Sequence, residues 1–140
     1  MNFLVSGIRS GPVEIDLKPS FASRGYTNVN YIVVPGRDEA QKIIDSGKSI
    51  DLMVLGGSPA GEFEAHNPSR ITEYSQEVNF SRANPKIPAI LLINNLHYAA
   101  QKELENQNPR GVICSWSEFS DMSKEQIKEI ISRRGVDISR

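Results

Sequence analysis

The chain has 140 residues, of which 39% are hydrophobic and 24% charged, and its formal net charge is −1 at pH 7. These values fit one compact domain and exclude a general electrostatic attraction to nucleic acid or to anionic membranes. No apolar run approaches the roughly 20 residues of a membrane span, and the first residues do not resemble a signal peptide. With a single cysteine, Cys114, the chain cannot form an internal disulfide. We therefore expect one cytoplasmic domain over residues 1–140.

Five apolar segments of strand length follow one another along the chain. They are predicted at 3–6, 29–34, 50–55, 89–93 and 111–115. The third and fourth are the most apolar, which is typical of strands buried on both faces of a parallel sheet, so we expect them at its centre. The second partly alternates between polar and apolar residues and is expected nearer an edge.

Residues 11–25 allow two interpretations. The segment 13–17 alternates like a strand, whereas Pro12 could begin a helix that Pro19 would break or kink. We favour a helix, short and starting near Pro19, with Leu17 and Phe21 facing the sheet.

Between the second and third strands, Asp38 is placed to cap a helix that ends at Gly47. Its buried positions would be Ala40, Ile43 and Ile44. The alternation of strands and helices predicts a parallel sheet with right-handed crossovers.

Three further helices are predicted from apolar residues at helical spacing. Segment 70–82 carries Ile71, Tyr74 and Val78, and segment 96–105 carries Tyr98, Ala99, Ala100 and Leu104. The last helix has a capping box of Ser123 and Gln126. Its buried stripe is Ile127, Ile130 and Ile131, and Gly135 follows as a stop.

Five short segments carry a resemblance to a known family through their order and spacing. They are Arg24-Gly25-Tyr26, Gly36-Arg37-Asp38-Glu39-Ala40, Ile50-Asp51-Leu52-Met53-Val54-Leu55, Ile87-Pro88-Ala89-Ile90-Leu91-Leu92 and Gly111-Val112-Ile113. From Phe3 to about Ile131, their order and spacing resemble the receiver domain of bacterial two-component response regulators. The resemblance implies a flavodoxin-like three-layer α/β sandwich with a five-stranded parallel sheet of order 2-1-3-4-5 and about five helices. It also implies a role in signal transduction.

The positions that carry receiver chemistry do not match that family. Ser6 and Gly7 stand where the resemblance requires the acidic pair, and Gly56 stands at the phosphoacceptor aspartate. Ile93, followed by Asn94, replaces the small hydroxyl residue, and Ser115, followed by Trp116 instead of proline, replaces the lysine. Magnesium binds hard oxygen ligands that usually include carboxylates. We therefore expect no metal, no cofactor and no phosphoryl transfer, as in an atypical pseudo-receiver.

The loops after the strands keep other interpretations open. Arg9 after the first strand, and Gly57 and Ser58 after the third, could bind an anionic ligand or nucleotide, although plain turns explain both segments more simply. Asn94, Asn95 and His97, with Ser58, could suggest hydrolysis. Because no acid is placed to orient the histidine, we favour helix capping there. We interpret Cys114 as a core residue rather than a nucleophile.

Trp116, Phe119 and Met122 follow the fifth strand in a predicted loop, where packing under the loop and an exposed anchor are equally consistent. In the receiver family, the fourth helix, fifth strand and fifth helix form the usual docking and dimer face. Here that face would contain Tyr98, Lys102, Trp116, Phe119, Lys124 and Lys128.

The leading hypothesis is a non-enzymatic pseudo-receiver that binds a protein partner, with homodimerisation open and no nucleic-acid or membrane contact. The alternative is an α/β domain that binds a small anionic ligand or nucleotide at the strand ends.

Overall fold

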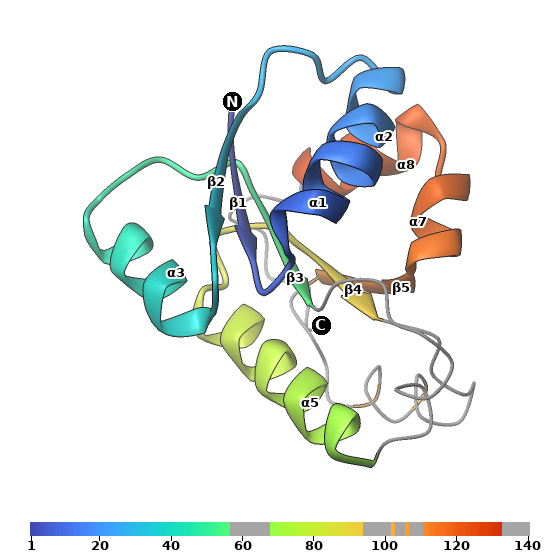
Figure 1. Cartoon of the computed structure of the whole chain (residues 1–140). Coiled ribbons are helices and arrows are strands. Elements are labelled where there is room, and N and C mark those ends of the chain that lie inside the picture. The colour runs from blue at the N-terminus through green and yellow to red at the C-terminus, as the bar shows by residue number, and fades with distance from the viewer. Residues whose placement is uncertain (57–67, 94–101, 103–105, 107–110, 133–140) are drawn as a thin grey trace.

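The computed structural model describes residues 1–56, 68–93, 102, 106 and 111–132. Its centre is a parallel sheet of five strands: β1 (Asn2–Ser6), β2 (Asn30–Val34), β3 (Leu52–Gly56), β4 (Ala89–Ile93) and β5 (Gly111–Ser115). The order β2-β1-β3-β4-β5 confirms the predicted topology (Figure 1). All residues of β3 and β4 are buried and no residue of β2 is, as the hydrophobic patterns predict.

Helices cover both faces of the sheet (Figure 1). One face carries the continuous helical segment α1 (Ser10–Pro12), η1 (Val13–Leu17) and α2 (Lys18–Ser23), together with α7 (Trp116–Asp121) and α8 (Lys124–Ser132). The other face carries α3 (Arg37–Asp45) and α5 (Pro68–Ala83). Within the described ranges, no helix is long and apolar enough to cross a membrane.

Two hydrophobic clusters fill the space between the helices and the sheet. The first cluster lies on the α2, α7 and α8 face and has Phe3, Val5, Leu17, Phe21, Val54, Phe119 and Ile127 among its members. The second cluster lies on the α3 and α5 face and includes Leu4, Ala40, Met53, Leu55, Tyr74, Val78 and Leu91. Alternate residues of β1 and β3 belong to opposite clusters, because successive side chains of a strand point to opposite faces.

The predicted short helix starting near Pro19 is present as α2, which begins at Lys18. The prediction missed the helical turns α1 and η1 that precede it, so the continuous segment begins at Ser10. A π-helical turn at Val13–Leu17, in which the Lys18 N–H donates to the Val13 carbonyl, precedes the proline. Proline has no N–H and its ring clashes with the carbonyl four residues earlier in a regular α-helix. The wider turn in front of Pro19 lets the helix continue. Leu17 and Phe21 are buried against the sheet, as predicted.

The helix between β2 and β3 begins differently from the prediction. The N-cap of α3 is Gly36, which has no side chain that could accept a hydrogen bond from the helix. Asp38 lies inside the first turn. Asp38 is therefore not the cap. The predicted stop is confirmed, because Gly47 follows the helix with φ +84°, a left-handed conformation that favours glycine. Ala40 is buried, and Ile43 and Ile44 pack partly buried against the second cluster.

The capping box of the last helix is confirmed. The Ser123 N–H donates to Gln126 Oε1 at 2.7 Å, and the Gln126 N–H donates to Ser123 Oγ at 3.1 Å. Ile127 and Ile130 are buried, and Ile131 is partly buried. In α5, Tyr74 and Val78 are buried as predicted. Ile71 side-chain packing, the helix at 96–105 and Gly135 lie outside the described part of the structure.

Candidate functional site

The carboxyl ends of the central strands bring the predicted site positions to one edge of the sheet. Ser6 pairs with Leu55 of β3, Gly56 pairs with Leu92 of β4, and Ile93 pairs with Ser115 of β5. In parallel α/β sheets, ligands bind outside this edge.

Gly56, at the phosphoacceptor position, has a backbone that excludes a side chain. Its φ is +139°, which L-residues with a Cβ rarely adopt. A Cβ added there would lie 2.0 Å from the Leu92 carbonyl oxygen of the neighbouring strand. An aspartate at this position would therefore require β3 and β4 to separate locally.

Gly7, the residue after β1, lies beside Gly56 at the carboxyl ends of the strands. Its φ is +82°, and a Cβ added to it would lie 2.3 Å from the Gly56 carbonyl oxygen. Because the backbones at Gly7 and Gly56 approach one another so closely, they occupy the space into which acidic side chains would project. The glycines do more than omit two carboxylates, since neighbouring backbone atoms leave no room for a Cβ at either position.

The other matched positions are also uncharged. Ser6 is fully buried, and its hydroxyl has no hydrogen-bond partner in the described ranges. Ile93 is 1% exposed and belongs to the second cluster. Ser115 is the N-cap of α7, where its Oγ accepts a hydrogen bond from the Glu118 N–H at 3.1 Å. Its hydroxyl is thus engaged in helix capping.

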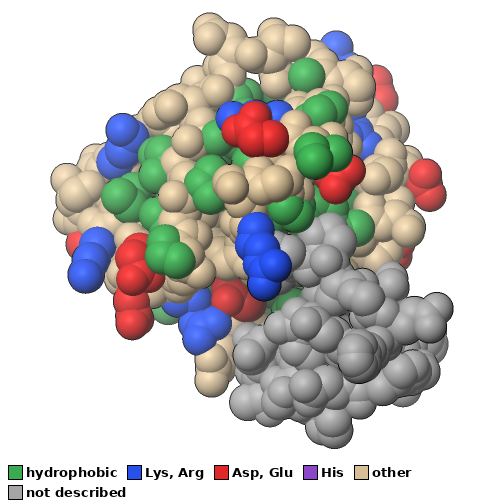
Figure 2. Space-filling model, viewed as in Figure 1, with side chains coloured by type: hydrophobic (Ala, Val, Ile, Leu, Met, Phe, Trp, Pro, Cys, Tyr) green, Lys and Arg blue, Asp and Glu red, His purple; other side chains and the backbone are tan. Residues whose placement is uncertain are grey.

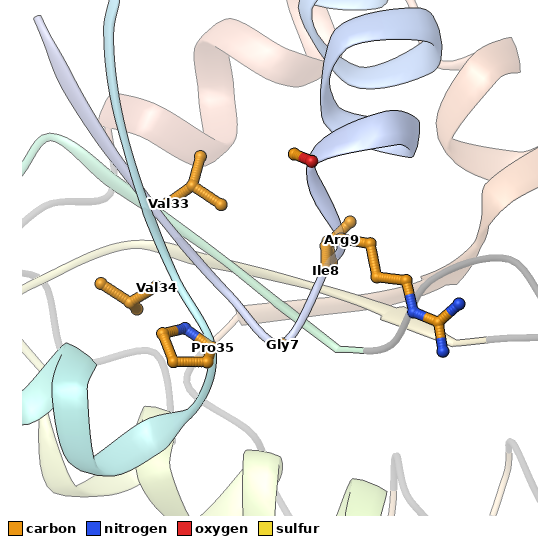
Figure 3. Close-up of a pocket in the computed structure, with 7 residues that line it drawn as sticks. Gly7, Ile8, Arg9, Val33, Val34 and Pro35 are labelled. Atoms are coloured by element: carbon orange, nitrogen blue, oxygen red, sulfur yellow. The ribbon is translucent and has the colours of Figure 1, made fainter.

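A cleft of about 420 Å³ lies between the loop after β1 and the end of β2 (Figure 3). It is lined by Gly7, Ile8, Arg9, Ser10, Val33, Val34 and Pro35. The Arg9 side chain is exposed, and its guanidinium is directed away from Val34 and Pro35 (Figure 3). The β2 wall of the cleft is therefore apolar, and the one cationic side chain of its lining points elsewhere.

The remaining candidate ligand positions, and the residues for which helix capping was favoured over hydrolysis, lie outside the described residues. These are Gly57, Ser58, Asn94, Asn95 and His97. Among the residues that the structure does describe, no group of three or more His, Cys, Asp or Glu side chains could hold a metal ion.

The predicted loop after β5 is the helix α7, so that prediction is wrong. The segment Ser115-Trp116-Ser117-Glu118 was the sequence signal for this helix, because it has the pattern of a capping box. Both hydrogen bonds of the box, one in each direction between Ser115 and Glu118, are present. Phe119 is 1% exposed and belongs to the first cluster, so it cannot contact a partner. Trp116 and Met122 pack partly buried against that cluster. The indole Nε1 of Trp116 is buried without a hydrogen-bond partner in the described part of the chain.

The structure describes three of the four remaining residues of the predicted partner face. Lys102, Lys124 and Lys128 are exposed, and Tyr98 lies outside the described residues. Lys124 begins α8, and Lys128 follows one turn later on the same helix.

Arg24 is a structural residue that sequence analysis missed. It is 8% exposed, and its guanidinium donates to the carbonyls of Ser20, Phe119, Ser120 and Met122 and to Ser20 Oγ, at 2.6–2.8 Å. Its Cζ lies 5.2 Å from the centroid of the Phe119 ring. These contacts join α2 to the end of α7, where the carbonyls of a helix terminus favour a cation.

Cys114 lies in the core as expected, 2% exposed within the first cluster. Burial, with a smaller contribution from the negative charge of Glu118, raises the pKa of its thiol to about 12. A thiol that stays protonated is a poor nucleophile.

No family model matches the chain, and no curated protein matches its sequence. Solved structures resemble it in fold. A putative pilus assembly-related protein from Burkholderia pseudomallei matches with a TM-score of 0.57 at 13% identity, over 96% of this chain and 88% of that one. The receiver domain of Francisella response regulator 1452 matches with a TM-score of 0.56 at 12% identity, over 94% and 97%.

A third similar structure is RcsB from Salmonella enterica serovar Typhimurium bound to promoter rprA. It has a TM-score of 0.53 at 12% identity, and the match covers 99% of this chain and 70% of that one. The chain therefore has the receiver-like, flavodoxin-like fold. At these identities, the likeness concerns the fold and not the activity.

Proposed function

We propose that this chain is a receiver-like signalling module that works without phosphorylation and without catalysis, by binding another protein. The observation that carries this proposal is the backbone at Gly56, where a Cβ would lie 2.0 Å from the Leu92 carbonyl oxygen. A phosphoryl switch needs an acceptor carboxylate and acidic ligands for magnesium. The described strand ends offer Ser6, Gly7, Gly56 and Ser115 in their place.

The proposed partner face consists of Trp116, Lys124 and Lys128, with Lys102 and Tyr98 assigned to it only by resemblance. Lys124 and Lys128 are exposed on α8, and so are Glu125 and Glu129, so a complementary partner surface would carry charges of both signs. The partly buried indole of Trp116 supplies an aromatic group of the kind enriched in binding hot spots.

The phosphorylation half of the proposal is tested by amide NMR with magnesium and beryllofluoride, using a receiver domain that has its aspartate as the positive control. We expect no saturable shifts at Gly7, Gly56 or Ser115. Saturable shifts at these residues would refute the loss of the phosphoryl site. A nucleotide panel in the same titration tests the alternative: a saturable response at Gly7, Ile8 and Ser10 to a nucleotide alone would favour small-ligand binding in the cleft.

The partner half is tested by placing a photo-cross-linking amino acid at Lys128 and, as a matched control, at Lys42, an exposed lysine of α3 on the other face. In cells, we expect one discrete adduct from position 128, abolished by Lys124→Glu. Equal adducts from both positions, or adducts insensitive to Lys124→Glu, would show that α8 is not the docking face.

A further inference from the structure

The cleft between the loop after β1 and the end of β2 has two walls that the fold holds in place. Gly7 lies between the walls (Figure 3), and its N–H donates to the Val34 carbonyl at 3.2 Å. On the helical side, the Val13 N–H donates to the Arg9 carbonyl at 3.2 Å, and the Val13 side chain is buried in the first cluster. Because both walls are anchored, the cleft is preformed, as most small-molecule sites are.

The wall formed by β2 is apolar and open to a ligand. The Val33 side chain is 42% exposed and points from β2 toward the helical segment, and Pro35 continues the same wall (Figure 3). Figure 2 shows hydrophobic side chains gathered on the face where β2 and the first helical segment lie. An apolar molecule in the cleft would remove this surface, as well as its own, from water.

Charge in the lining argues against an ionic ligand. Arg9 is the only ionisable residue that lines the cleft, and its guanidinium is directed away from the β2 wall (Figure 3). An ion placed against Val33 and Pro35 would lose hydration without gaining an opposite charge, which is unfavourable. The lining therefore favours an uncharged molecule over the anion or nucleotide that the sequence left open.

A single side-chain hydroxyl completes the lining. Ser10 is exposed at the start of the helical segment, on the wall that faces β2. A serine hydroxyl can both donate and accept a hydrogen bond, so it can pair with a hydroxyl or a carbonyl group. The volume of about 420 Å³ lies within the range of sites that hold small organic molecules.

We propose that this cleft binds an uncharged, mainly apolar small molecule that carries one hydroxyl or carbonyl group. The apolar body of the ligand lies against Val33 and Pro35, and its polar group forms a hydrogen bond with the Ser10 hydroxyl. The site is separate from the proposed partner face, because that face lies on α7 and α8. Its test is therefore independent of the proposed function.

Two probes with the same rings and different charge test the proposal by amide NMR on the full-length chain at pH 7. Naphthol is uncharged at this pH, and naphthoate is an anion. We expect naphthol to cause saturable shifts that are largest at Gly7, Ile8, Ser10, Val33 and Val34. Naphthoate should bind about tenfold more weakly or less, because no cation of the lining faces the β2 wall.

Variants of the two walls locate the binding. Val33→Asp places a charge on the apolar wall and should weaken naphthol binding about tenfold or more. Ile15→Asp is the matched control, because Ile15 is 74% exposed and lies outside the lining, and it should leave the affinity unchanged. Ser10→Ala changes an exposed residue and should weaken binding about threefold or more by removing one hydrogen bond. The amide spectrum of each variant confirms that it is folded.

Three results would overturn the proposal. The first is no saturable shift at the cleft residues with naphthol. The second is tighter binding of naphthoate, which would assign the cleft to anions. The third is equal weakening by Val33→Asp and Ile15→Asp, because the probe would then adsorb to exposed hydrophobic surface in general.

Discussion

Single residues decide what the strand ends can do. At Gly56 a side chain is excluded by a positive φ and by the Leu92 carbonyl, and at Gly7 by the Gly56 carbonyl. The missing carboxylates were visible in the sequence, because residue identity alone shows that Gly56 cannot accept a phosphoryl group. The closure of the space was not visible, because it depends on how closely the backbones of adjacent strands approach.

Restoring the aspartate should therefore damage the fold rather than restore a switch. Gly56→Asp is expected to lower the free energy of unfolding by about 3 kcal/mol or more, from backbone strain and overlap with β4. Urea unfolding measures the loss. Gly11→Ala is the control: no atom lies within 4 Å of its added Cβ, and its change should stay within about 1 kcal/mol. A Gly56→Asp chain as stable as wild type would contradict the steric argument.

Cys114 gives a pH prediction with a defined sign. Its thiol pKa is raised from 9.0 to about 12 in the folded chain. Well below pH 9 the thiol is protonated whether the chain is folded or unfolded. As the pH rises from 9 toward 12, only the unfolded chain releases the proton, so stability falls by up to about 1.4 kcal/mol per pH unit.

The stability advantage of wild type over Cys114→Ala should accordingly shrink as the pH rises from 9 to 11. Urea unfolding of both proteins at each pH measures it. An advantage independent of pH would show that the folded thiol ionises as easily as the unfolded one. At pH 8, native Cys114 should also react with a thiol reagent far more slowly than the same residue in urea.

At the level of elements, the strands and most helices followed from the sequence, because burial imposes a period that residue types reveal. Val54 and Ile90 lie in unbroken apolar runs, and both runs are interior strands. Pro19 marked the start of α2 correctly but hid the helical turns before it, because a proline usually ends a preceding helix. Val13 and Leu17 of the π turn are both buried against the sheet. Arg24 could not be found, because nothing in a lone arginine predicts which distant carbonyls surround it.

Arg24 is expected to hold α2 against α7. Arg24→Lys should lower the free energy of unfolding by about 2 kcal/mol or more, because one ammonium cannot reach the carbonyls of Ser20, Phe119 and Met122 together and leaves buried acceptors unpaired. Chemical denaturation measures this loss. Lys86→Ala, an exposed change elsewhere, should stay within about 0.5 kcal/mol. Rescue of stability by lysine would show that charge alone is sufficient.

The two hydrophobic clusters pack on opposite faces of one sheet, so we expect the whole molecule to unfold as a unit. Trp116, the only tryptophan, reports on the first cluster, whereas Val78 is fully buried in the second. Val78→Ala should cost about 2 kcal/mol and shift the Trp116 fluorescence transition as far as the far-UV circular dichroism transition. Asn79→Ala, exposed on the same helix, should shift neither. A fluorescence midpoint that does not move would mean that the two faces unfold separately.

The sheet order also bears on how the protein is made. Since β1 lies between β2 and β3, all pairings of these three strands are encoded in residues 1–56, and β4 and β5 join one after the other on the far side. Chains fold from the amino terminus as they leave the ribosome. The β2 edge is thus complete before β5 has been translated. The first three strands can therefore pair with one another before the strands that complete the sheet are available.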